Sequence, residues 1–149
     1  MSNYRQQALI DAPVEVVWEL LKDVNHHAEW WPNIVEAECD EVEQGCEYRN
    51  VVERPGPLPD LATTLYIEKL DDCEEVLIRC LDTGTYTHFV LVEAQGGTFV
   101  DAEFGTEPKK LDLKVFDAIA GKRYFRRWLE QSLDALRRVA AERGRSRAG

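Results

Sequence analysis

Four residues of this 149-residue chain have side chains and surroundings suited to transferring a proton or polarising a carbonyl group. His88 lies in the apolar run 87–92, where burial would shift its pKa and let it act as an acid or a base. Arg49, in another extended segment, could direct its guanidinium at a carboxylate or a ketone oxygen. Asp101 and Glu103 are two residues apart and would form an acid/base pair if their face of the strand is the inner one.

Each of these candidates also has an ordinary structural explanation. His88 fits a core histidine whose ring is satisfied by neighbouring groups, and Arg49 fits a surface arginine that faces acidic side chains. Asp101 and Glu103 fit a solvent-facing pair, because burying two carboxylates without partners is costly. The four residues are therefore candidate catalytic residues only if the protein is an enzyme.

A second set of side chains could line a binding pocket or its mouth. Most of the set is aromatic, and core packing explains such residues equally well. The expected ligand-binding residues are Trp30, Trp31, Tyr48, Tyr66, His88, Phe116 and Tyr124.

No metal site and no cofactor are expected. His26 and His27 are adjacent on a predicted helical turn, so they point in different directions, and no third ligand follows at a matching spacing. The four cysteines contain no C-x-x-C pair and are expected to be free, mostly buried thiols. The sequence also contains no nucleophile elbow, phosphate-binding glycine loop or dinucleotide fingerprint.

The elements that must position these side chains are predicted from periodicity and turn chemistry. A strand over residues 4–11 leads into an amphipathic helix over 14–24 and then into a helical turn and loop over 25–33. Segments rich in β-branched and aromatic residues follow, separated by Gly, Pro, Asn and Asp turns, which is typical of an antiparallel meander. These segments cover residues 34–42, 46–53, 61–70, 76–81, 86–94 and 98–104.

The C-terminal part predicts a long amphipathic helix that covers the sheet. An apolar stripe recurs at helical spacing from Leu111 to Val139, with a break or kink expected at 121–123. The helix is expected to end near Gly144 and to leave a flexible tail at 145–149. Residues 1–144 are therefore expected to form one domain.

The order of elements, together with motifs near the N-terminus, resembles the START-like, or SRPBCC, superfamily, and most closely its polyketide cyclase/dehydrase and lipid-transport branch. In that family an Ala-Pro pair opens the first helix, a Trp follows, an Asp closes the helix, and a Trp-x-Pro-like segment precedes the second strand. The matching positions here are Ala12, Pro13, Trp18, Asp23, Trp30, Trp31 and Pro32. The resemblance implies an α+β helix-grip fold: a strongly bent antiparallel sheet of about seven strands, wrapped around a long C-terminal helix, with short helices after the first strand.

The resemblance also implies a deep apolar pocket between the sheet and the C-terminal helix. The leading expectation is a carrier or sensor that binds a hydrophobic small molecule such as a lipid, quinone, isoprenoid or polyketide. A first alternative is a cofactor-independent polyketide cyclase, aromatase or dehydratase that uses His88, Arg49 or the Asp101/Glu103 pair. A second alternative is a protein-interaction or membrane-docking module that uses the basic run 122–128.

Charge and composition limit the kinds of partner that are expected. The net charge is −10 and the sequence pI is about 4.8, so nucleic-acid binding is not expected. No apolar run is long enough to span a membrane and residues 1–7 are polar, which predicts a cytoplasmic protein without stable membrane insertion. The protein is expected to be a monomer or a weak homodimer. Residues 1–108 carry 6 basic and 23 acidic side chains, whereas residues 109–149 carry 12 basic and 5 acidic ones. Either the basic C-terminal element packs across an acidic body, or it faces an anionic partner.

Overall fold

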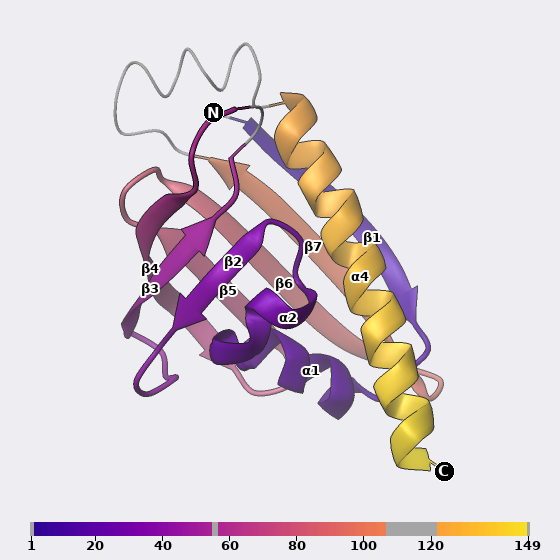
Figure 1. Ribbon diagram of the computed structural model, residues 1–149. Coiled ribbons are helices and arrows are strands. Elements are labelled where there is room, and N and C mark those ends of the chain that lie inside the picture. Colours follow the sequence, from indigo (N-terminus) through magenta and orange to yellow (C-terminus); the bar gives the residue numbers. More distant parts are fainter. Residues whose placement is uncertain (1, 55–56, 107–121, 149) are drawn as a thin grey trace.

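Seven strands form one antiparallel sheet in the order β1-β7-β6-β5-β4-β3-β2. This computed structural model describes residues 2–54, 57–106 and 122–148 (Figure 1). The strands are β1 Ser2–Ile10, β2 Ile34–Glu38, β3 Glu47–Val52, β4 Leu61–Asp71, β5 Glu75–Cys80, β6 Thr85–Ala94 and β7 Gly97–Thr106. The helices are α1 Val14–Lys22, η1 Val24–His26, α2 His27–Trp30 and α4 Lys122–Ala148.

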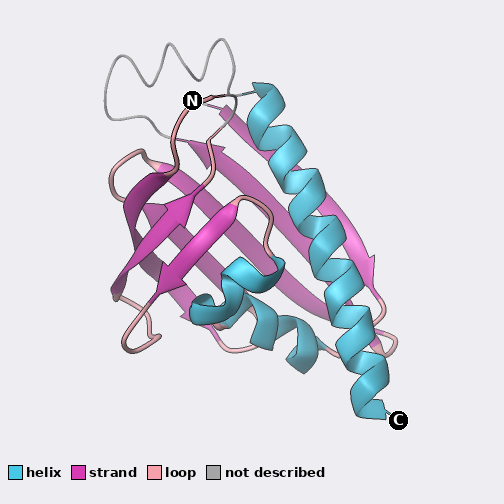
Figure 2. Cartoon of the chain, viewed as in Figure 1, coloured by secondary structure: helices cyan, strands magenta, loops and turns pink. Residues whose placement is uncertain are grey.

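From β2 to β7 each strand pairs with the next one in sequence. Strand β1 pairs with β7 and forms the edge of the sheet opposite to β2. The short helices lie between β1 and β2, and α4 packs along β1 and β7 (Figure 1). Figure 2 shows that α4 and the short helices lie on the same side of the curled sheet. The arrangement is the helix-grip fold that the sequence predicts.

Alternation along the strands separates an apolar inner face from a mixed outer face. In β7, Val100, Ala102 and Phe104 are fully buried, while Asp101 and Glu103 between them are only partly buried. The inner residues pack against the helices in one hydrophobic core. Because side chains alternate between faces with a period of two, each pair of neighbouring residues on a strand is divided between the core and the outer surface.

Helix α4 presents its predicted apolar stripe to the sheet. Phe125, Trp128, Leu129 and Leu136 are buried, whereas arginines such as Arg126 are exposed. None of the helices that the structure describes is long and apolar enough to span a bilayer.

Most predicted element boundaries agree with the structure to within a few residues, but the end of the last helix was wrong. Helix α4 continues past Gly144 to Ala148, since Gly144 lies in the helix against Ala12 and Pro13 instead of forming a left-handed cap. The predicted stripe between residues 111 and 119 and part of the predicted kink at 121–123 lie outside the described residues. The four cysteines are free, as expected, with Cys39 and Cys80 buried.

Candidate ligand-binding cavity

A cavity of about 300 Å³ lies between the inner face of the sheet and the N-terminal half of α4. Strands β3 to β6 supply most of its wall, and the segment from α2 to β2 and helix α4 close the other side. The residues lining it are mainly apolar or neutral polar. They are His27, Trp31, Ile34, Tyr48, Asn50, Val52, Arg54, Leu58, Leu61, Thr63, Leu65, Ile78, Cys80, Thr83, Thr85, Tyr86, Thr87, Thr106, Tyr124, Phe125 and Trp128.

Two tryptophans on the cavity wall are fixed by hydrogen bonds that tie α4 to the segment between α2 and β2. The indole N–H of Trp31 donates to Ser132 Oγ at 2.9 Å, and that of Trp128 donates to the Pro32 carbonyl at 2.6 Å. The two indoles also stack, with ring centroids 6.2 Å apart. Their buried N–H groups are thus satisfied, and the ring faces form a rigid apolar wall.

The sheet side of the cavity carries hydroxyl groups from several threonines. Thr63 donates to the backbone carbonyl of Asn50 at 3.3 Å, and Thr83 donates to the hydroxyl of Thr85 at 2.9 Å. Thr87 is buried on β6 and also contributes to the lining. These neutral groups can position a ligand without requiring it to carry a charge.

Tyr48 and Asn50 add two further neutral polar groups from the inner face of β3. Tyr48 is 5% exposed, and burial raises the pKa of its phenol, so the hydroxyl stays protonated. Asn50 is 2% exposed, and its amide oxygen has no hydrogen-bond partner in the part of the chain that the structure describes. A buried polar atom without a partner is uncommon in a folded protein and calls for an explanation.

His27 lines the same cavity from the start of α2. Its ring is fully buried, and this desolvation lowers its pKa to about 4. Nε2 lies 2.7 Å from the Leu21 carbonyl, which can only accept, so the neutral ring carries its proton on Nε2. The imidazole contacts Trp31 edge-on, with centroids 4.9 Å apart.

Arg54 is the charged side chain among the described residues that line the cavity. It is half-buried beyond the end of β3, and its Nε donates to the Pro59 carbonyl at 2.8 Å. Leu58, in the same loop, is 46% exposed while also lining the cavity. An apolar residue that faces both solvent and cavity marks this loop as part of the mouth.

Three of the expected ligand-binding residues, Trp31, Tyr48 and Tyr124, line the cavity. Trp30 is buried behind Trp31, with the two rings stacked 5.2 Å apart. Tyr66 lies on the outer face of β4, because the residues on either side of it, Leu65 and Ile67, face inward. Phe116 lies outside the described residues.

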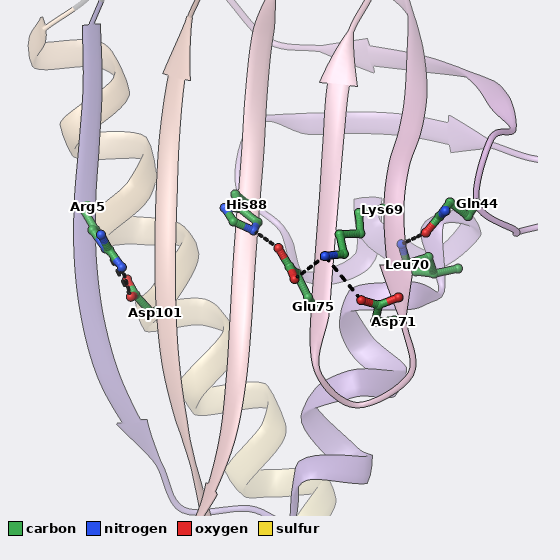
Figure 3. Close-up of polar contacts among 8 residues, drawn as sticks. All are labelled: Arg5, Gln44, Lys69, Leu70, Asp71, Glu75, His88 and Asp101. Carbon is green, nitrogen blue, oxygen red and sulfur yellow. Dashed lines mark hydrogen bonds and ion pairs between the residues drawn. The ribbon is translucent and has the colours of Figure 1, made fainter.

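The structure places His88, Asp101 and Glu103 on neighbouring strands, but on the outer face of the sheet, away from the cavity. Figure 3 shows His88 and Asp101 with their partners. His88 Nε2 lies 2.5 Å from Glu75, which also pairs with Lys69 at 3.1 Å. Asp101 and Glu103 could form an acid/base pair for a ligand only if their side chains faced the inner side of the sheet. That condition is not met, so these residues cannot reach a molecule held in the cavity.

The carboxylates on the outer face have partners that keep them ionised. The Arg5 guanidinium hydrogen-bonds to Asp101 and lowers the pKa of that carboxyl group. The Tyr86 hydroxyl donates to Glu103 at 2.6 Å and lowers its pKa, and His88 does the same for Glu75. An acid held in its charged form does not act as a general acid near neutral pH, so this arrangement is suited to cross-linking strands.

Arg49 also points away from the cavity. It pairs with Glu36 of the neighbouring strand at 3.0 Å, and its side chain is 55% exposed. This is the surface role that was the structural alternative for Arg49. Among the residues that the structure describes, no group of three or more His, Cys, Asp or Glu side chains is arranged to hold a metal ion.

Sequence reasoning identified Tyr48 and Tyr124 but missed other polar groups that line the cavity, above all Asn50 and His27. A usable signal existed for Asn50, because it alternates with Arg49 and shares a strand face with Tyr48. His27 gave no comparable signal, since its burial depends on the tertiary packing of a single helical turn.

A seven-stranded sheet that encloses an apolar cavity against a C-terminal helix defines the helix-grip class of folds. A family model described as polyketide cyclase / dehydrase and lipid transport matches residues 1–141, so the chain belongs to that family.

Solved structures with the same fold include two aromatase/cyclases. The Zhui aromatase/cyclase of a Streptomyces species has a TM-score of 0.68 and 19% identity, and the match covers 95% of this chain and 94% of that one. The di-domain aromatase/cyclase StfQ of the steffimycin biosynthetic pathway has a TM-score of 0.73 and 15% identity, and the match covers 99% of this chain and 51% of StfQ. A protein of Chromobacterium violaceum has a TM-score of 0.73 and 20% identity, and the match covers 95% of this chain and 99% of that one. At these identities the matches show a shared fold. No curated protein matches the sequence.

Proposed function

We propose that this protein binds a neutral, hydrophobic small molecule in the cavity between the sheet and α4, as a carrier or a sensor. The observation that carries the proposal is the lining itself: an aromatic wall of fixed indoles opposite neutral hydroxyl, phenol and amide groups. Such a surface takes up apolar material and orients it through a few hydrogen bonds. Membership of a family described by polyketide chemistry and lipid transport supports the same class of ligand.

A cofactor-independent cyclase or dehydratase is the second candidate. The family description and the two aromatase/cyclases of the same fold favour it. In this case the reacting carbonyl would meet the groups of the cavity, with the Tyr48 hydroxyl as the donor that polarises it. The outer-face residues His88, Asp101 and Glu103 and the paired Arg49 would then not take part.

Native mass spectrometry of freshly purified protein, followed by organic extraction, tests the binding proposal. An apolar cavity that binds tightly retains what it captured in the cell, so we expect a reproducible added mass that is lost on denaturation. The extracted compound would identify the ligand class. Incubating a linear poly-β-ketone precursor of that compound with the protein separates the two candidates, because a carrier returns the precursor unchanged and a cyclase converts it.

Two threonines next to each other on β4 provide a matched pair of variants. Thr63 is buried on the cavity wall, whereas Thr64 is exposed on the outer face. Thr63→Trp fills cavity space, and we expect it to weaken binding of the neutral fluorophore N-phenyl-1-naphthylamine by at least ~10-fold, because overpacked apolar sites lose more than 1 kcal/mol. Thr64→Trp should bind like wild type. Equal affinity of both variants in a fluorescence titration would place the ligand outside the cavity and contradict the proposal.

A further inference from the structure

Three buried side-chain polar atoms in the described part of the chain lack a hydrogen-bond partner, and one of them belongs to a residue that lines the cavity. The three atoms are Trp18 Nε1, Trp30 Nε1 and Asn50 Oδ1. Neither Trp18 nor Trp30 lines the cavity, whereas Asn50 does. The unsatisfied amide of Asn50 is therefore a feature of the candidate binding site.

The fold prevents Asn50 from withdrawing to water. It is in the middle of β3, where its backbone pairs with Ala37 of β2 on one side and Thr63 of β4 on the other. The side chain can therefore turn only about its own bonds and remains at the cavity wall. An acceptor oxygen that is held at the cavity without a partner requires a donor, and a bound molecule can supply one.

The neighbouring side chains do not supply that donor. The Thr63 hydroxyl, opposite Asn50, donates to the backbone carbonyl of Asn50 at 3.3 Å. Tyr48, on the same strand face about 7 Å away along the chain, has no hydrogen-bond partner among the described residues. It therefore adds a second neutral group, which can both donate and accept.

No charged group among the described lining residues compensates an ion at this position. The described cation of the lining, Arg54, lies four residues further along the chain, and its Nε is engaged by Pro59. A carboxylate held against Asn50 would lose its hydration and present two further acceptors to an amide oxygen that needs a donor. A hydroxyl group, in contrast, donates to the amide oxygen and accepts from the phenol.

We propose that Asn50 and Tyr48 form a hydroxyl-recognition subsite, and that the ligand of this cavity is an apolar, uncharged molecule carrying a phenol, enol or alcohol group. The inference rests on the proposed function, because it concerns the same cavity. It deepens that function by requiring a hydrogen-bond donor on the ligand at this subsite, which a carboxylate, a ketone or an ether does not offer.

Three naphthalene derivatives of similar shape test this proposal: 2-naphthol, 2-methoxynaphthalene and 2-naphthoate. Binding is followed at pH 7 by the fluorescence of Trp31 and Trp128, which lie on the cavity wall. We expect 2-naphthol to bind about 3–10-fold more tightly than 2-methoxynaphthalene, the ratio typical of one neutral hydrogen bond, and 2-naphthoate to bind most weakly. Since this comparison uses the unaltered protein, it does not depend on the folding of any variant.

Asn50→Leu removes the amide while keeping a side chain of similar size. We expect the ratio between 2-naphthol and 2-methoxynaphthalene to fall to within about 2-fold, because the hydrogen bond is lost while apolar contact remains. Thr64→Val is the control, since it removes a hydroxyl from the exposed outer face of the neighbouring strand β4, outside the cavity lining, and should leave the ratio unchanged.

The possible failures separate the two proposals. Binding of all three compounds with equal affinity, or an unchanged ratio in Asn50→Leu, would overturn the hydroxyl subsite and leave the hydrophobic cavity standing. Tightest binding of 2-naphthoate would also overturn the subsite. Absence of binding for every compound would contradict the proposed function together with the subsite.

Discussion

At the scale of single residues, burial of His27 makes the stability of the protein depend on pH. The pKa of His27 is lowered from 6.5 to about 4 by desolvation. Below pH 6.5 the unfolded chain therefore binds a proton that the folded chain excludes, and stability decreases as the pH falls from 6.5 toward 4. We expect the free energy of unfolding, measured by urea denaturation, to decrease by roughly 2 kcal/mol between pH 7 and pH 5 from this group alone.

Two adjacent histidines make this prediction testable. His27→Gln retains a donor for the Leu21 carbonyl but cannot titrate, so its stability should be nearly constant between pH 7 and pH 5. His26 is exposed and its pKa is raised, first by its hydrogen bond to Asp23. His26→Gln should therefore keep the loss of stability in acid that wild type shows. An equally steep pH profile in His27→Gln would mean that another group is responsible.

Residue types alone did not identify the groups that face the cavity, for a physical reason. Tyr48 and Arg49 were both expected at the site, yet neighbours on a strand point to opposite faces, so only one of them can line the cavity. The structure selects Tyr48, and Arg49 pairs with Glu36. Which of the two residues lines the cavity depends on which face of the sheet the helices cover. The periodicity of one strand does not contain this information, because it is set by tertiary packing.

At the scale of elements, one close approach of backbones fixes how β1 meets the β6–β7 hairpin. A Cβ atom on Gly97 would lie 2.7 Å from the Ile10 carbonyl oxygen, which is well inside contact distance. Gly97→Ala should therefore lower the free energy of unfolding by about 1–3 kcal/mol, as other overpacking substitutions do. Thermal unfolding monitored by circular dichroism measures the effect.

Gly144 provides the contrasting substitution. It lies inside α4, where an added Cβ would meet the Cβ of Ala12 at 3.4 Å, an ordinary van der Waals distance. Gly144→Ala should stabilise the protein by up to about 1 kcal/mol, because alanine favours the helix more than glycine does. If Gly144→Ala were as damaging as Gly97→Ala, the continuous helix through Gly144 would be wrong.

The elements themselves were largely predictable, since turn chemistry and periodicity act over short distances. The six segments that make up β2 to β7 begin and end near Gly, Pro, Asn and Asp clusters, and the stripe of α4 has helical spacing. The ends of β2 and α4 were the exceptions, since β2 stops at Glu38 and not at residue 42, and α4 continues past Gly144. A glycine near a helix end usually terminates it, but here packing against Ala12 and Pro13 continues the helix.

At the scale of the whole molecule, ion pairs among the described residues do not join helix α4 to the sheet, despite the uneven division of charge. Helix α4 meets β1 and β7 through its apolar stripe, and its exposed arginines pair along the helix, as in Arg126–Glu130 and Asp134–Arg137, both at 3.4 Å. The basic surface of α4 thus faces outward. Hydrophobic burial and the two indole hydrogen bonds join the helix to the rest of the fold.

Because the cavity lies between α4 and the sheet, a ligand that occupies it contacts both and should stabilise their association. A molecule that binds only the folded state adds about 2.7 kcal/mol at a free concentration of 100 times Kd. For a protein of about 150 residues, each kcal/mol raises Tm by about 2–4 °C, so we expect saturating N-phenyl-1-naphthylamine to raise Tm by roughly 5–10 °C. Thr64→Trp should show the same increase in differential scanning calorimetry. At the same concentration, a ~10-fold weaker Kd leaves about 1.4 kcal/mol, so Thr63→Trp should show about half of this increase or less. An equal increase in both variants would mean that the compound binds outside the space enclosed by α4 and the sheet.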